Sequence, residues 1–292
     1  MRLGLAALAA GLLAAGPALA APAVEFQDVA ARVVVAPEDR QDLKVEVMRP
    51  NPNLPLRIWG FAGRMHVAGG LGRRLGACHR NGGRPSVSIA GVGEIPVSAL
   101  PYVVVRTPLH ARVFVAGAVW GSAGRSDGLD FSNSGCGDWL VADVRNRMRL
   151  TLAGRGGVRT GDAGSAELSV GGEGSIATGH IRRGLTALSA GPGAIEVARV
   201  DGPFVARIAG PGSIHVVSGD VTLMEATVAG AGAVVFDGMA HSLKASIIGS
   251  GDVRVARVTG PVLRSVIGRG EVRIGPGPPP AAPGPRVGPL GH

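Results

Sequence analysis

The hydrophobic pattern of residues 135–275 repeats about every 19 residues. Apolar residues recur two, four and seven positions after a Gly-x-Gly pair, and again near positions eleven and fifteen. In one repeat they are Ile195, Val197, Val200, Phe204 and Ile208. Apolar residues two apart point to the same face of a strand. The pattern therefore predicts short strands, because the spacing of an amphipathic helix is not sustained anywhere in this region.

Paired glycines mark the start of each repeat. The pairs begin at Gly135, Gly154, Gly172, Gly191, Gly210, Gly230, Gly249 and Gly268, with successive spacings of 19, 18, 19, 19, 20, 19 and 19 residues. A glycine inside a strand costs about 0.5–1 kcal/mol relative to alanine. Sixteen such glycines would cost roughly 8–16 kcal/mol, as much as the whole stability of a domain. We therefore expect them at turns with positive φ, or where coils stack too closely for a Cβ.

Short strands in register can satisfy their backbone groups by stacking coil upon coil, about 4.8 Å apart. We therefore predict an all-β protein, a parallel β-helix (a solenoid) with coils of about 19 residues. The predicted parts are a signal peptide at 1–20, an N-terminal β segment and cap at 21–85, β-helix coils at 86–275, and a disordered Pro/Gly-rich tail at 276–292. Residues 21–275 are expected to form one domain.

The first residues are typical of a secretory signal peptide. Arg2 precedes an apolar run from Leu3 to Ala15, and Ala18-Leu19-Ala20 offers a small-x-small cleavage site. We predict cleavage after Ala20, which leaves Ala21 rather than a lipidated cysteine at the start of the mature chain. No later stretch has the length of a membrane span. The sequence thus predicts an exported protein, in the periplasm or at the cell surface, with no membrane span.

The two cysteines, Cys78 and Cys136, leave two alternatives open. In an oxidising compartment they can form one disulfide, worth about 4–5 kcal/mol in the chain-entropy model. They can also be two buried thiols. We favour the disulfide.

Composition narrows the class of partner. Glycine accounts for 48 of 292 residues and the net charge is +9. Abundant, regularly spaced apolar residues exclude a disordered chain. A positive exported protein is attracted to anionic surfaces of the envelope, so we expect anionic glycan or lipid headgroups as partners. Nucleic acid is not expected, because no run of basic residues interleaved with aromatics is present.

The repeat resembles a known family, the bacterial autotransporter-adhesin head GIN domain proteins. The residues that carry the resemblance are Val24-Glu25-Phe26-Gln27-Asp28-Val29, Arg32-Val33-Val34-Val35, Gly135-Cys136-Gly137-Asp138 and Ile248-Gly249-Ser250-Gly251-Asp252-Val253-Arg254-Val255. The resemblance covers residues 24–275. It implies a right-handed parallel β-helix without catalytic activity.

Metal and cofactor sites are not predicted. Glycine-rich rolls that bind calcium stack carboxylates, and the residue after each glycine pair would have to supply them. These residues are Asp138, Gly157, Ser175, Ala194, Ser213, Ala233, Asp252 and Glu271, of which three carry a carboxylate. No zinc-binding spacing of cysteines or histidines occurs either. We therefore expect no metal and no cofactor.

Two groups of residues are candidates for chemistry. Four acids in the irregular coils, near Trp120 and Trp139, are the nearest approach to a polysaccharide-cleaving site: Asp127, Asp130, Asp138 and Asp143. The more ordinary interpretation is that they are solvated loop acids. The second group is a weakly basic stripe for an anionic ligand, formed by equivalent residues of three coils: His180, Arg199 and Arg257.

These features favour an exported, non-catalytic β-helix protein of the bacterial envelope, acting in adhesion, surface binding or a structural role. One alternative is a β-helix enzyme that modifies polysaccharide. The other is a periplasmic scaffold that self-associates through the uncapped ends of its coils.

Overall fold

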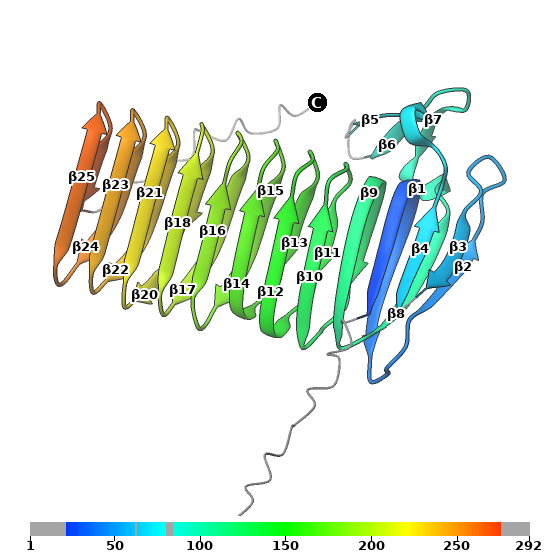
Figure 1. Cartoon of the computed structure of the whole chain (residues 1–292), viewed down its shortest axis with the longest axis horizontal. Coiled ribbons are helices and arrows are strands. Elements are labelled where there is room, and N and C mark those ends of the chain that lie inside the picture. The colour runs from blue at the N-terminus through cyan, green and yellow to red at the C-terminus, as the bar shows by residue number, and fades with distance from the viewer. Residues whose placement is uncertain (1–21, 62, 80–83, 276–292) are drawn as a thin grey trace, which may run out of the picture.

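The computed structural model describes residues 22–61, 63–79 and 84–275, which form a β-solenoid of about nine turns with a repeat of about 19 residues (Figure 1). The strands are parallel between successive coils, so the predicted all-β parallel β-helix is confirmed. The predicted signal peptide with its cleavage site and the tail at 276–292 lie outside the described residues. Among the described residues, no helix is long and apolar enough to cross a membrane.

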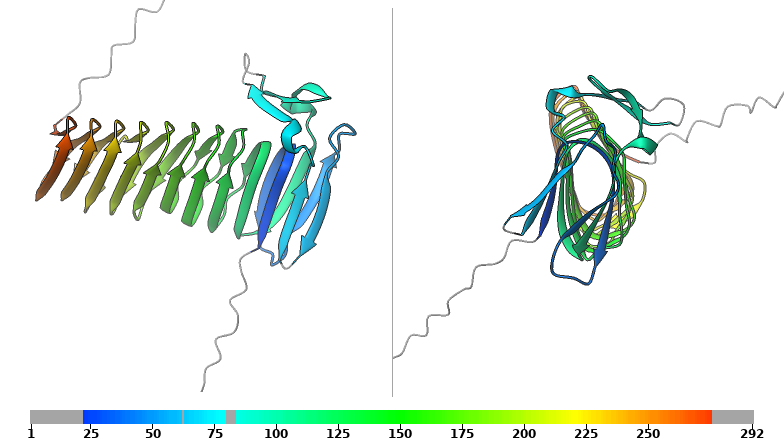
Figure 2. Two further views of the ribbon diagram at one scale, coloured as in Figure 1. Left: turned by 45° about the horizontal axis from the view of Figure 1, so that its top comes forward. Right: turned by 90° about the vertical axis from the view of Figure 1, so that its right-hand side faces the viewer.

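Two long faces form the walls of the β-helix (Figures 1 and 2). Face A contains β11 (Trp139–Val141), β13 (Gly157–Thr160), β15 (Ser175–Ile181), β17 (Ala194–Asp201), β19 (Ser213–Val216), β22 (Ala233–Ala240), β24 (Asp252–Val258) and β26 (Glu271–Ile274). Face B contains β10 (Gly128–Asn133), β12 (Val144–Leu152), β14 (Ala163–Val170), β16 (Leu185–Ser189), β18 (Phe204–Ala209), β21 (Met224–Gly230), β23 (Leu243–Gly249) and β25 (Val262–Gly268). The short β20 (Gly219–Val221) pairs with β17 and β22 at a corner.

The core consists of apolar ladders that run along the axis of the solenoid. One ladder on face A joins equivalent residues of six coils: Ile176, Ile195, Ile214, Val234, Val253 and Val272. All six are buried. Full burial of such a side chain contributes about 1.5–3 kcal/mol. The apolar period of the sequence thus corresponds to aliphatic side chains stacked directly on one another.

The paired glycines lie at the corners, for both of the reasons expected from the sequence. Gly249 has φ +127°, a conformation that other residues rarely adopt. A Cβ there would also collide with the carbonyl oxygen of Gly230 in the preceding coil. Gly154 has no such φ, but its Cβ would collide with the carbonyl oxygen of Gly135. The corners therefore stack backbone directly on backbone.

The N-terminal strand lies inside the stack. β1 (Ala23–Glu38) pairs in parallel with β9 (His110–Ala123) on one side and with β4 (Arg64–Ala68) and β8 (Tyr102–Pro108) on the other. Antiparallel strands then close this end: β3 (Arg57–Phe61) on β4 and β2 (Lys44–Arg49) on β8. Residues before and after position 85 therefore interleave, and no break in the structure corresponds to the expected boundary there.

A small antiparallel sheet lies against the outside of the solenoid near the N-terminal end (Figure 2). It consists of β5 (Leu75–His79), β6 (Ser86–Ile89) and β7 (Gly93–Pro96), flanked by the 3-10 turns η1 (Gly72–Arg74) and η3 (Val97–Ala99). Its apolar side chains cover the outward-facing Trp120. A disulfide between Cys78 of β5 and Cys136, whose Cα atoms are 6.1 Å apart, joins this sheet to a corner of the coils.

The C-terminal end carries a charge at an inward-facing position. One buried ladder of face B runs through Ala187, Ala206, Ala226 and Ala245. The next member, on β25, is Arg264. Inward-pointing charges on edge strands oppose pairing with another chain. Arg264 therefore disfavours the stacking of a further coil at this end.

Gly249→Ala should destabilise the protein by at least about 1–3 kcal/mol, since alanine would have to adopt a strained φ. The collision with the Gly230 carbonyl oxygen adds to this cost. The measurement is the midpoint of denaturant unfolding. Gly171→Ala is the matched control, because a Cβ there would meet no atom closer than 3.8 Å. Equal midpoints for the two variants would contradict this account of the corners.

Arg264→Ala should promote association, because it continues the alanine ladder and removes the charge that opposes strand addition. We expect a monomer before the change and a concentration-dependent oligomer after it, measured by sedimentation velocity. Arg207→Ala, at an exposed outward position on β18, should leave the sedimentation coefficient unchanged. If the two variants sediment alike, Arg264 has no such role.

Candidate functional site

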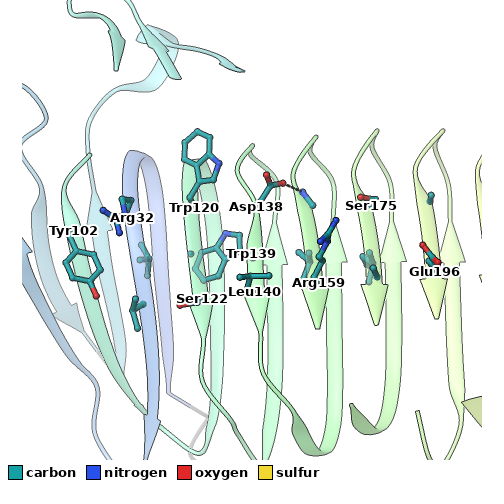
Figure 3. A pocket seen from close by; sticks show the side chains of 18 residues that line it. Arg32, Tyr102, Trp120, Ser122, Asp138, Trp139, Leu140, Arg159, Ser175 and Glu196 are labelled. Carbon is teal, nitrogen blue, oxygen red and sulfur yellow. Dashed lines mark hydrogen bonds between the residues drawn. The ribbon is translucent and has the colours of Figure 1, made fainter. Parts of the chain in front are cut away.

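A groove of about 620 Å³ runs along face A near the N-terminal end (Figure 3). Residues of seven consecutive strands of the stack line it: β8, β1, β9, β11, β13, β15 and β17. Six spacings of about 4.8 Å give it a length of about 29 Å. Because it crosses the strands, it fits an elongated ligand that lies along the axis of the solenoid.

The hollow results from one outward row of side chains that changes from large to small. The row begins with Tyr102, Arg32 and Trp120 and continues past Asp138. Its next members are Gly157, Ser175 and Ala194, which have little or no side chain. These are the residues that follow successive glycine pairs, and their variation along the sequence becomes the depth of the groove.

Cationic and apolar side chains flank the small residues (Figure 3). The guanidinium of Arg32 lies 5.3 Å from the ring centroid of Tyr102, within the range of a cation–π interaction. Further along the groove, Leu140 and Arg159 are neighbours in the adjacent outward row, and Leu140 is 62% exposed. Glu196 lies at the far end.

Trp120, on the third of the seven strands, lines the groove and is only 9% exposed. Its indole N–H has no hydrogen-bond partner among the described residues. Trp139 points into the core instead, where its ring lies 4.8 Å from that of Phe131. A buried N–H group without a hydrogen-bond acceptor costs free energy. An oxygen atom of a ligand beside Trp120 would supply the acceptor that its indole N–H lacks.

The four acids near the tryptophans do not converge. Asp130 is on β10 of face B, 3.3 Å from the Arg112 guanidinium, whereas Asp138 immediately precedes β11 of face A. Asp127 lies 3.2 Å from Arg145. Asp143 accepts a hydrogen bond from the backbone N–H of residue 162 at 2.9 Å. Each acid is thus engaged separately.

Asp138 lines the groove, but its carboxylate has a structural partner. It accepts a hydrogen bond from the backbone N–H of Gly157, in the next coil, at 2.9 Å. Asp252 does the same for the backbone N–H of Glu271 at 3.0 Å. The carboxylates of Asp138 and Asp252 therefore join successive coils. No group of three metal-ligating side chains suitable for a metal ion occurs in the described parts of the chain.

The structure brings together two of the three residues of the basic stripe. His180 and Arg199 are direct neighbours on β15 and β17. Arg257 lies three coils further on and belongs to a different row, opposite Met239. The reason is a register shift between Phe236 and Met239, which a constant count from the glycine pairs does not include.

Asp201 contacts both residues of the pair. Its carboxylate lies 2.6 Å from His180 Nε2 and 2.9 Å from the Arg199 guanidinium. Partial burial acts to raise the pKa of Asp201, but hydrogen bonds from Arg199, His180 and the backbone of Asp220 outweigh it. The pKa of Asp201 therefore lies below its ordinary value. In the groove, Trp120 and Asp138 separate the two guanidinium groups of Arg32 and Arg159 along the stack.

Comparisons with known proteins show a shared fold. No protein-family model matches the sequence, and no curated protein is similar to it at a significant level. The chain is similar to a solved "putative adhesin" from Parabacteroides distasonis, with 17% identity and a TM-score of 0.51, over 87% of this chain and 93% of that one. A β-solenoid of similar architecture thus exists among solved structures.

Two further solved structures are more distant. One is a "putative lipid binding protein" from Parabacteroides distasonis, with 16% identity, a TM-score of 0.38, and coverage of 87% of this chain and 91% of that one. The other is a "putative adhesin" from Bacteroides fragilis, with 12% identity, a TM-score of 0.41, and coverage of 86% and 91%.

Asp201→Asn should lower the free energy of unfolding at neutral pH by about 1 kcal/mol, a value typical of partly exposed ion pairs. A carboxyl whose pKa is lowered on folding stabilises the protein above its unfolded pKa, near 3.9, and loses this effect as the pH falls through the folded value. The difference between variant and parent, measured by denaturant unfolding, should therefore vanish in acid. Asp39→Asn, at an exposed loop position, should show no such pH-dependent difference.

Proposed function

We propose that the protein is an exported, non-catalytic binding protein of the bacterial cell envelope, and that the groove on face A holds a linear acidic polysaccharide. The observation that carries the proposal is the composition of the groove: two guanidinium groups, Arg32 and Arg159, three coils apart, with a floor of small residues that begins at Gly157 beside Arg159. A bound chain would lie along the axis of the solenoid and contact several coils at once.

Spacing and charge both favour a polymer with repeated negative groups. Arg32 is on β1 and Arg159 on β13, three coil spacings apart, or about 14 Å. Tyr102 and Ser122 supply hydroxyl groups near Arg32, and Leu140 supplies an apolar surface. Glu196 would repel an anion at the far end, whereas the carboxylate of Asp138, between the two arginines, already accepts a hydrogen bond from the backbone N–H of Gly157. The proposed binding region therefore extends from Tyr102 to Arg159.

The arrangement of acids supports a role without catalysis. Glycosidases need two carboxyl groups about 5–10 Å apart that face one substrate. The candidate acids instead hold the coils together or pair with arginines on different faces. The polysaccharide-modifying alternative therefore finds no support in the geometry.

Two further observations are consistent with the proposed location and role. A disulfide such as Cys78–Cys136 is stable in oxidising compartments, which agrees with export. The fold is shared with a protein described as an adhesin, and adhesins act by surface binding. Arg264 argues against the self-associating scaffold, because it opposes the addition of a coil.

Arg32→Gln combined with Arg159→Gln should weaken binding to alginate, a linear polyuronate, by at least about tenfold, since each charged hydrogen bond contributes about 1.5–3 kcal/mol before solvent screening. Binding is measured by isothermal titration calorimetry at low and high salt, and we expect it to weaken with salt. Neutral dextran is the ligand control and should not bind.

The matched variant is Arg207→Gln, which removes an exposed arginine from face B and should leave alginate binding unchanged. If alginate does not bind the parent protein, or binds both variants alike, the groove is not a site for acidic polysaccharide. Release of reducing ends from alginate would contradict the non-catalytic role.

A further inference from the structure

The positive charge of the chain is concentrated at one end of the solenoid. Residues 47–93 contain seven arginines and no aspartate or glutamate: Arg49, Arg57, Arg64, Arg73, Arg74, Arg80 and Arg84. This segment includes the closing hairpin β3–β4 and the strands β5 and β6 of the small sheet, which lie at the N-terminal end (Figure 1). The next acid along the chain is Glu94 of β7, which accepts a hydrogen bond from the hydroxyl of Ser86. The nearby acids Glu38, Asp42 and Glu46 are paired with Arg40, Lys44 and Arg106.

The hairpin β3–β4 adds exposed aromatic side chains to this charge. Arg57, Trp59 and Phe61 alternate along β3, so they point to the same, outward face. Phe61 is 80% exposed and Trp59 is 47% exposed. Phe61 lies opposite Arg64 on β4, and the other residues of β3 point toward the core side, opposite Val67 and Met65.

Among the described residues of β1, β3 and β4, one acidic side chain lies next to this outward face. Glu25 of β1 lies 3.4 Å from His66 and 3.7 Å from Arg64. Arg57 and Arg64 against a single carboxylate leave the hairpin with a positive charge. Exposed aromatics flanked by arginines are the side chains that enter the interface of an anionic bilayer, where the rings reach the acyl boundary and the guanidinium groups contact phosphates.

We propose that the hairpin β3–β4, through Arg57, Trp59, Phe61 and Arg64, docks the protein on an anionic phospholipid bilayer surface. Binding of this kind combines two contributions. Each arginine near an anionic surface contributes a factor of about five in affinity, and burial of an aromatic side chain contributes about tenfold. This proposal is independent of the groove, which is on face A. The hairpin β3–β4 pairs with the first half of β1, and that half is joined through β9 to β10 of face B.

The test uses vesicles of equal parts phosphatidylcholine and phosphatidylglycerol, with pure phosphatidylcholine vesicles as the comparison. Co-sedimentation should show binding to the anionic vesicles only. Trp59 provides a second readout, because Trp120 and Trp139 are 9% and 1% exposed and already in apolar surroundings. A blue shift of tryptophan emission upon binding, absent from Trp59→Phe, would place the hairpin in the interface.

Two variants separate charge from apolar insertion. Arg57→Gln with Arg64→Gln should weaken vesicle binding by about thirtyfold. Phe61→Ser should weaken it by about tenfold and reduce the blue shift of Trp59. The matched controls lie elsewhere on the rod: Leu263→Ser with Ile267→Ser, both 65% exposed on β25, and Arg207→Gln with Arg269→Gln. The controls should bind as the parent does.

Several outcomes would overturn the proposal. Equal binding to both kinds of vesicle would show that charge does not drive the binding. An equal loss of vesicle binding in the β25 control variant would show that the hairpin is not the docking site. Binding without a shift in Trp59 emission would indicate a soluble polyanion site, such as one for nucleic acid, rather than a membrane surface. The groove variant Arg32→Gln/Arg159→Gln must still bind vesicles, so a loss there would assign the binding to the groove.

Discussion

Backbone hydrogen bonds between successive coils determine where every side chain of this protein lies. Each coil sits about 4.8 Å above the previous one, so a residue is stacked on its equivalent in the coil below. At the corners this spacing leaves no room for a Cβ, and glycines such as Gly154 and Gly249 occupy those positions. Along the walls the same spacing places aliphatic residues on one another and makes a continuous core from short strands.

The same stacking restricts what the outer surface can carry. Identical charges at equivalent positions would face each other at the coil spacing, and one row of face B avoids this by alternating Arg112, Asp130, Arg149 and Glu167. Hydrogen bonds from Arg149 and then Arg147 hold the pKa of Glu167 below its usual range. Acids elsewhere accept hydrogen bonds from the next coil. These charged residues thus serve the stack, and a ligand site needs charged groups that do not.

The regular coils could be predicted from the sequence because their contacts join residues about 19 positions apart, which a repeat search detects directly. β1 could not be placed in this way, since its partners lie far away in the sequence and no glycine pair marks the register. A single shift between Phe236 and Met239 was enough to remove Arg257 from the predicted stripe. The groove depends on a change from Trp120 to small residues along one row, which is visible only when the register is known.

The two ends of the solenoid are protected against the addition of further strands in different ways, so the two ends of the rod differ in structure. At the C-terminal end, Arg264 occupies an inward position where alanine occurs in the preceding coils. At the N-terminal end, antiparallel strands close the stack and expose Trp59 and Phe61 among arginines. The groove begins near that same end, but on the opposite face. A rod held by the outward side chains of its N-terminal hairpin would therefore keep the groove, which lies on the other face, free.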